Sequence, residues 1–303
     1  MPLNTEMIGA QTPSIAHNVD ARWIMAYAAA IRDLNPAYMD TSAGASMAEA
    51  MGALMAHPLF PVCLEWPAIL KSRELPGFQT SSTAERSRGV HAAHDLHIYQ
   101  PLIAGEVYET QATITDLQQI KPGAAQTLRL DTRNRHGELV CRTWQLTISR
   151  DVSVVEAGER FPVDQAVKTD FVPPASPKKA PGDEINKHYV MVVEAGAAHI
   201  YTECARIWNP IHTDKAFALA AGLPDIILHG TATLAMAVTR LVDEFLQGRP
   251  GRVNRIGGRF TGMVLMPTLL SLDVLWQSAS YIGFAITDEQ GSLVFSGGFI
   301  GYT

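Results

Sequence analysis

The hydrophobic pattern of this chain changes from helical spacing to strand alternation. Residues 20–31 place Trp23, Tyr27 and Ile31 on one side of a helix that Asn18 or Asp20 can cap. Short helices are expected at 46–55 and 65–73. Strands bounded by Gly and Pro turn residues are then predicted at 90–100, 106–117, 125–133 and 139–150. The first half therefore predicts helices followed by an antiparallel meander.

The second half repeats this order after a proline-rich stretch. Residues 171–182 contain four prolines and two lysines, a composition typical of an exposed, semi-rigid linker. The elements predicted after it are helices at 196–206, 214–221 and 231–247, and strands at 189–193, 255–262, 268–278, 281–287 and 293–301. We therefore predict an N-terminal module at 1–165, a linker at 166–185 and a C-terminal module at 186–303.

A sequence motif is also repeated. Tyr201 precedes Asn209-Pro210-Ile-His212 by the spacing at which Tyr27 precedes Asn35-Pro36-Ala-Tyr38. Such an internal repeat indicates two duplicated modules. The sequence offset between the two copies is smaller at their last hairpins than at this motif. The first module therefore carries an extra segment between the two points. The polar residues 79–88 are the natural place for it.

Composition narrows the class of protein. Among 303 residues, 47% are hydrophobic and 18% charged, which is typical of a globular protein with a large core. The net charge of −6 argues against nucleic acid as the main partner, because phosphate binding needs a basic surface. The three cysteines are unclustered, and no run of about 20 apolar residues suggests a membrane span. With no apolar signal core near Met1, we expect a cytoplasmic protein.

The second copy of the motif resembles that of MaoC-like dehydratases and (R)-specific enoyl-CoA hydratases. Their motif is a Tyr, a spacer and Gly-Asp-x-Asn-Pro-x-His, followed by a His-Gly that opens a central helix. The residues that fit are Tyr201, Asn209, Pro210, His212, His229 and Gly230. The resemblance implies an α+β double hotdog, in which each half wraps an antiparallel sheet around a long central helix. The N-terminal half looks like the family's degenerate hotdog.

The chain departs from the family motif at its catalytic carboxylate. The position of the family's Asp is Ile207, and Arg206 replaces the preceding Gly. The first copy shows the reverse case, because Asp33 is present but Tyr38 replaces the His. Neither copy therefore holds a complete Asp/His pair.

The resemblance implies a site at the second copy. His212 would be the base, Asn209 would orient the water or the imidazole, and the Gly230 and Thr231 amides would hold the thioester oxygen. The structural alternative for His212 is a loop histidine bonded to the backbone. Residues expected to bind substrate are Tyr201, Pro210, His229, Thr231 and Arg255. Arg255 would contact CoA phosphates, although a solvated strand edge explains it equally well.

Other side chains are candidates for the missing carboxylate or for a metal site. Glu203 lies one helical turn before Ile207, and Asp214, Asp33 and Glu65 are alternatives, although a solvated surface charge is the common fate of Glu. The triple His91, His94 and His97 lies in a predicted strand, where His94 should point opposite to the other two. We therefore predict no metal site.

The preferred function is reversible hydration and dehydration of 2-enoyl-CoA and 3-hydroxyacyl-CoA thioesters, with CoA as part of the substrate and no other cofactor. One alternative is a hotdog thioesterase in which Glu65 or Glu203 activates water. Another is a non-catalytic acyl-CoA-binding subunit, because Ile207 replaces the usual Asp. Neither nucleic acid nor a membrane is expected as a partner, and a homodimer of double hotdogs is compatible with this interpretation.

Overall fold

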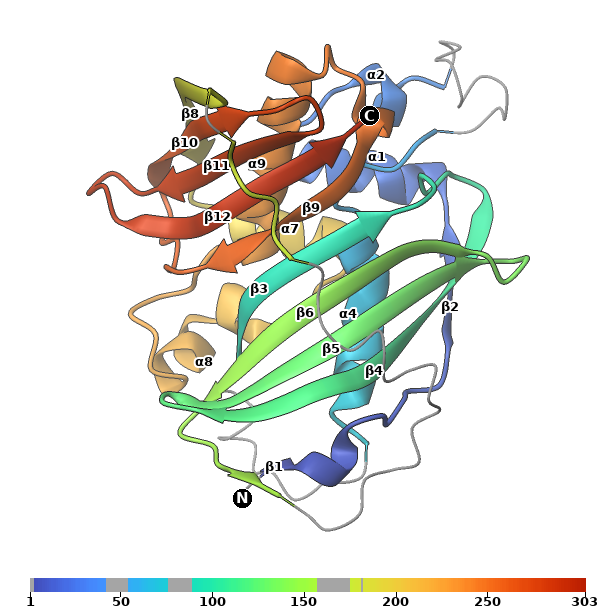
Figure 1. Cartoon of the computed structure of the whole chain (residues 1–303), viewed down its shortest axis with the longest axis vertical. Helices are drawn as coiled ribbons and strands as arrows, with labels where there is room; N and C mark the ends of the chain where they lie inside the picture. Colours follow the sequence, from blue (N-terminus) through green and yellow to red (C-terminus); the bar gives the residue numbers. More distant parts are fainter. Residues whose placement is uncertain (1–2, 42–53, 76–88, 157–174, 181) are drawn as a thin grey trace.

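A computed structural model of the chain describes residues 3–41, 54–75, 89–156, 175–180 and 182–303. Its centre is a ten-stranded sheet in the order β2-β4-β5-β6-β3-β9-β12-β11-β10-β8, and every neighbouring pair is antiparallel (Figure 1). A separate parallel pair joins β1 (Leu3–Asn4) to β7 (Val154–Val155). The predicted double hotdog is confirmed, and its two half-sheets join into one continuous sheet.

Each half of the chain contributes one side of the large sheet. The first half supplies β2 (Ile15–Val19), β3 (Gly89–Ile98), β4 (Glu106–Ile120), β5 (Gly123–Asn134) and β6 (Leu139–Arg150). The second half supplies β8 (Glu184–Val193), β9 (Val253–Phe260), β10 (Thr268–Gln277), β11 (Tyr281–Thr287) and β12 (Leu293–Tyr302). The edge strand β2 was not predicted, and β8 begins earlier than expected.

The helices also come in matching sets. The first half has η1 (Thr5–Met7), α1 (Ala21–Ala30), α2 (Pro36–Met39) and the central helix α4 (Pro61–Ser72). The second half has α7 (Ala197–Ala205), η2 (Pro210–His212), α8 (Lys215–Ala220), the central helix α9 (Gly230–Phe245) and η3 (Pro250–Arg252). None of the described helices has the length and hydropathy needed to cross a bilayer.

Some predictions fall on residues that are not described. The helix expected at 46–55 lies almost wholly outside the described residues, and so does the extra polar segment at 79–88. Much of the predicted linker is likewise outside them. The module boundaries therefore stay a prediction. Within the described part, α4 begins at Pro61 and not at residue 65, because proline is well suited to the first turn of a helix.

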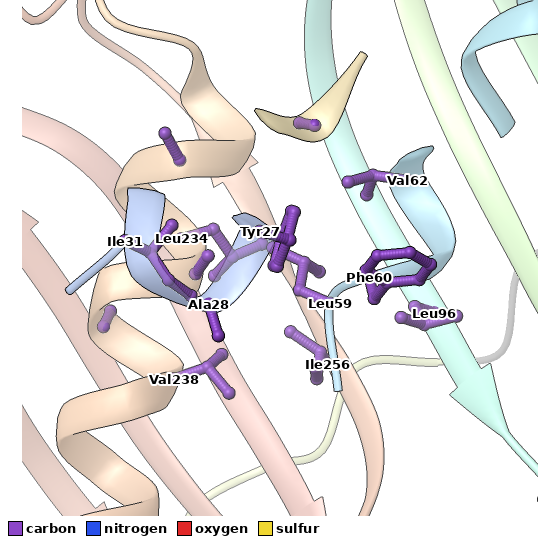
Figure 2. Close-up of a cluster of buried hydrophobic side chains, with 14 of the residues drawn as sticks. Tyr27, Ala28, Ile31, Leu59, Phe60, Val62, Leu96, Leu234, Val238 and Ile256 are labelled. Atoms are coloured by element: carbon purple, nitrogen blue, oxygen red, sulfur yellow. The ribbon is translucent and has the colours of Figure 1, made fainter. Parts of the chain in front are cut away.

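The two modules share one hydrophobic core. Figure 2 shows Tyr27 and Ala28 of α1, Leu59 and Phe60 before α4, Leu96 of β3, Leu234 and Val238 of α9 and Ile256 of β9 in a single cluster. Leu96 and Ile256 are directly paired across the junction of the two half-sheets. Burial of the apolar surface in this cluster is the main contribution to the stability of the fold. The modules are therefore one packed unit.

The duplicated tyrosines lie face to face near the pseudo-twofold axis. The hydroxyls of Tyr27 and Tyr201 are 3.5 Å apart, and their ring centroids are 5.7 Å apart. Residues at equivalent positions in a repeat meet in this way only next to the axis that relates the two copies. The motif that revealed the duplication in the sequence therefore also marks its symmetry axis.

The histidine triple on β3 corrects one expectation. A bulge between His91 and Ala93 shifts the strand register, so the rings of His91 and His94 lie on the same side, with centroids 5.5 Å apart. His97 lies beside Asp95, 3.4 Å from its carboxylate. Within the described residues, no group of three or more His, Cys, Asp or Glu side chains is arranged to hold a metal ion.

Candidate active site

The loop that contains the second copy of the motif begins where α7 ends. Arg206 adopts a left-handed conformation, with φ 59°, and this turns the chain out of the helix. Asn209 then starts the short 3-10 helix η2, and its side-chain oxygen accepts from the amide of Ile211 at 3.5 Å. Pro210 is exposed at the first position of η2. This local geometry carries His212 into the protein.

His212 is buried and has a defined proton arrangement. Its Nδ1 lies 2.8 Å from the carbonyl oxygen of Ile227, which fixes Nδ1 as the protonated nitrogen. Nε2 has no hydrogen-bonding partner among the described residues. Burial lowers the pKa of His212 to about 4, so the ring is neutral near pH 7. Nε2 therefore offers a free lone pair, as a general base requires.

His229 supports that ring from one side. The two imidazoles are stacked with centroids 3.6 Å apart and an interplanar angle of 23°. Nε2 of His229 lies 3.3 Å from both the Ile207 carbonyl oxygen and the Thr202 hydroxyl. Burial, together with the neighbouring His212, holds the pKa of His229 well below its usual range. This arrangement makes His229 an orienting residue.

The start of α9 provides two free backbone donors. Among the described residues, no acceptor bonds the amides of Gly230 and Thr231, whereas those of Ala232 and Thr233 bond the carbonyl oxygen of His229. The first amides of a helix point along its positive end and are well suited to an anionic oxygen. Because His229 directly precedes them, these donors lie next to the stacked imidazoles.

Only glycine fits at position 230. A Cβ atom there would lie 2.7 Å from Cδ1 of Phe260, closer than two carbon atoms can approach. Phe260, at the end of β9, therefore packs directly on the start of the helix. Sequence reasoning missed Phe260, because no motif or periodicity connects it with Gly230.

Tyr201 lies behind the helix start. Its hydroxyl donates to the Thr231 hydroxyl at 3.1 Å, and its ring lies 4.9 Å from that of His229. Burial raises the pKa of Tyr201 well above its usual range, so the phenol stays protonated. Tyr201 thus holds Thr231 and His229 in place from within the core.

In the structure, each candidate carboxylate forms a hydrogen bond elsewhere in the protein. Glu203 is exposed and accepts from the indole of Trp208 at 3.4 Å, and Asp214 caps α8 through the amide of Phe217. Glu65 is buried, accepts from the Thr143 hydroxyl, and has its pKa raised to about 7 by burial. None of these contacts involves His212. Ile207 itself is buried and bonds His229 only through its carbonyl oxygen.

Asp33 lies in the equivalent loop of the first module, where it faces the other central helix. Its carboxylate accepts from the amide of Asn35 at 3.0 Å and from the hydroxyl of Thr239, on α9, at 2.9 Å. Nε2 of His57 is 3.9 Å from the same carboxylate. A cavity of about 930 Å³ opens beside Asp33 and Thr239. Sequence reasoning missed His57, although His57-Pro58 occupies the place of His229-Gly230 in the repeat.

Arg255 does not fit the predicted phosphate-binding role. It is buried, and its Nε and Nη2 atoms bond both oxygens of Asp95 at 2.9 and 2.8 Å. This bidentate pair joins β9 to β3 across the module junction. The guanidinium is therefore occupied within the protein, which corrects the expectation that it contacts CoA.

Comparisons with known proteins find similar domains in both halves of the chain. Residues 177–290 match the MaoC-like domain, and residues 6–143 match the FAS1-like dehydratase domain region. The chain is 24% identical to "Enoyl-CoA hydratase 2, peroxisomal" of Arabidopsis thaliana over 249 residues, which are 79% of this chain and 75% of that protein.

Two further likenesses cover most of the chain. It is 25% identical to "Peroxisomal multifunctional enzyme type 2" of Drosophila melanogaster over 232 residues, but it spans only 36% of that longer protein. The crystal structure of a MaoC-like dehydratase from Phytophthora capsici covers 99% of this chain and 97% of its own, with a TM-score of 0.79 and 16% identity. At that identity, the structural likeness establishes the fold.

Proposed function

Because this chain is a double-hotdog protein with a MaoC-like domain in its second half, we propose that it reversibly hydrates 2-enoyl-CoA thioesters to 3-hydroxyacyl-CoA. One observation carries the proposal. A neutral imidazole with a free Nε2, on His212, lies beside the two unbonded amides of Gly230 and Thr231. The plant relative is named as an enoyl-CoA hydratase, and that name supports the same chemistry for this chain.

A single imidazole can carry out both proton transfers of the reaction. Nε2 of His212 takes a proton from water as the water oxygen bonds the β-carbon, and the double-bond electrons move toward the thioester. The resulting imidazolium then returns the proton to the α-carbon, and the neutral ring is regenerated. Asn209, at the start of η2, is the side chain in our proposal that orients the attacking water.

The helix start would stabilise the charge that develops during this step. The thioester oxygen becomes an enolate oxygen, and the amides of Gly230 and Thr231 are placed to donate to it. One such donor is typically worth about 10²–10³ in rate. They require no reorganisation, because α9 and Phe260 already fix them.

The missing carboxylate sets an expectation for the rate. General acid–base groups contribute about 10²–10⁴-fold, so an enzyme with Ile207 would work below the rate of one that has the full pair. Thioester hydrolysis is less well supported, because Glu203 is exposed and Glu65 is bonded inside the first module. Release of free thiol from an acyl-CoA without change at the double bond would identify hydrolysis.

The decisive experiment is a spectrophotometric enoyl-CoA hydration screen that compares the wild type with His212→Ala. We expect loss of turnover by about 10²-fold or more, with the fold intact by circular dichroism. Hydration by the variant at near wild-type rate would remove His212 from the mechanism. Binding of acyl-CoA with no turnover by the wild type would favour a non-catalytic subunit.

Compartment and assembly stay predictions. The plant relative is named as a peroxisomal enzyme, so the expected cytoplasmic location needs its own test by fractionation. A homodimer of double hotdogs, checked by light scattering, likewise remains our expectation.

A further inference from the structure

Several polar side chains lie on the inner face of the first module's sheet, where apolar side chains are expected. We call this set the polar inner patch, and it consists of His91, His94, Gln126, Gln145 and Thr147. These residues occupy three neighbouring strands. In the register, His94 pairs with Gln145, His91 pairs with Thr147, and Thr147 pairs with Gln126. The five side chains therefore form one continuous surface.

The sheet register shows that this surface faces inward. His94 is two positions before Leu96, which packs in the core shown in Figure 2, so the two side chains share a face. Gln126 pairs with Leu117 of β4, a member of the hydrophobic cluster against α4. His94, Gln126 and Gln145 are at least nine-tenths buried. Ordinary strand alternation would place apolar residues here.

Several atoms of the patch have no partner. Both ring nitrogens of His94 and the Nε2 atom of Gln126 are buried, and none of the described residues forms a hydrogen bond with them. An unsatisfied buried polar group costs about 1–3 kcal/mol, and native structures rarely keep one without a reason. A neutral imidazole has one N–H donor, and the Gln126 amide nitrogen has two. The patch is therefore suited to a ligand that supplies acceptor oxygens.

The patch is connected to the proposed active site through a series of ring contacts. The His94 ring packs against His91, and His91 packs on Phe260 with centroids 4.6 Å apart. Phe260 in turn packs on Gly230, whose amide we assign to the thioester oxygen. Starting from the amide that we assign to the thioester oxygen, His91 and His94 are therefore the polar side chains that follow Phe260 in this series of contacts.

We propose that the acyl group of the substrate carries an oxygen-bearing polar end, which the polar inner patch binds through His94 and Gln126. This inference rests on the proposed hydratase function and names its substrate class. A purely hydrocarbon chain would leave the unpaired nitrogens of His94 and Gln126 without acceptors. Such a site selects against a substrate that lacks the hydrogen-bonding group.

The experiment compares trans-2-enoyl-CoA esters of one chain length that end in a methyl, a hydroxyl or a carboxylate group. Each is tested with the wild type, His94→Leu, Gln126→Leu and the control His136→Leu, which changes an exposed histidine in a hairpin. We expect the wild type to favour an oxygen-ended ester over the methyl-ended one by about tenfold or more in kcat/KM. The preferred ester identifies the terminal group.

The variants separate ligand binding from a structural role. His94→Leu and Gln126→Leu should each reduce the preference by about tenfold without loss of thermal stability, because each removes an unsatisfied group. His136→Leu should retain it. Preference for the methyl-ended ester, or an unchanged ratio in both variants, would overturn the proposal.

The hydratase assignment is tested by a separate result. If the wild type hydrates none of the esters, the saturated methyl-ended and carboxylate-ended acyl-CoA thioesters are compared by titration calorimetry. The same tenfold preference in Kd is then expected, and equal affinities would count against the patch. Equal hydration rates for His212→Ala and the wild type would remove the assigned mechanism but leave the selectivity result intact.

Discussion

The two motif loops of this chain each hold one member of the Asp/His pair that the family resemblance leads us to expect. In the second module, His212 has a free ring nitrogen and lies beside two free amides, but Ile207 supplies no carboxylate. In the first module, Asp33 is present, whereas Tyr38 replaces the imidazole. The two loops therefore differ in which member of the pair is missing.

The helix starts distinguish the two loops more sharply than the carboxylate does. Pro58 occupies the position of Gly230 and has no amide hydrogen. The next amide, that of Leu59, donates to Nδ1 of His57 at 3.0 Å. The first module therefore has no free donor for an enolate oxygen at this place. Its Asp33 bonds Thr239 of the other module, which is a structural contact.

The largest expected effect concerns the helix start of the second module. Gly230→Ala would push a methyl group into Phe260 and displace the amides, so we expect kcat/KM to fall by about 10²-fold. Steady-state hydration kinetics measure this. The matched change Pro58→Ala, at the equivalent position of the first module, should stay within about twofold of the wild type. Equal losses in the two variants would contradict the assignment of a single site.

The next effect is on pH dependence. With the pKa of His212 near 4, kcat/KM should be flat from about pH 5.5 to about pH 8 and fall below that range as the ring is protonated. A pH–rate profile with an inflection near 6.5 would contradict a buried neutral base.

Protein stability should also decrease at acid pH. The pKa of His57 is lowered to about 3 by burial, so at mildly acid pH the unfolded chain binds protons that the folded chain does not. Stability should therefore fall as pH drops from about 6.5 toward 4. His57→Gln should weaken this pH dependence of unfolding and leave the pH–rate profile unchanged.

A smaller effect is expected at the contact between the modules. Thr239→Val removes the hydroxyl that donates to Asp33 and should lower the free energy of unfolding by about 1.5–3 kcal/mol. Denaturant titration measures it, with little change in kcat expected.

Asp33→Asn is the matched change on the other partner. Burial raises the pKa of Asp33, so its charged form weakens the fold as pH rises through that folded pKa. The Asn variant should match or exceed wild-type stability at neutral pH, and the difference should shrink below about pH 4. A large destabilisation at neutral pH would show that the charge itself holds the modules together.

The smallest effect is expected from a substitution at Tyr38, which occupies the position of His212 in the first copy of the motif. The Tyr38 hydroxyl is buried and has no hydrogen-bonding partner in the part of the chain that the structure describes. Tyr38→Phe should therefore leave hydration within about twofold and raise the free energy of unfolding by up to about 1 kcal/mol. A marked loss of activity would indicate that the first module takes part in the reaction.

Much of the architecture was already present in the sequence. The strands at 106–117, 139–150 and 281–287 were predicted close to their observed bounds, because alternation and turn residues are local properties. The repeated Tyr and Asn-Pro residues identified both the duplication and the loop that positions His212. His91 was misplaced relative to His94, because a bulge depends on the pairing with the neighbouring strand.

What the sequence by itself determined is the order of elements, the duplication and the identity of the loop residues, since each depends on neighbours along the chain. The tertiary structure alone decided which of these residues are available for chemistry. Arg255 is paired with Asp95, and Asp33 accepts a hydrogen bond from Thr239. Phe260 packs against Gly230, and Nε2 of His212 is free. Those outcomes depend on packing between distant segments, which local spacing does not encode.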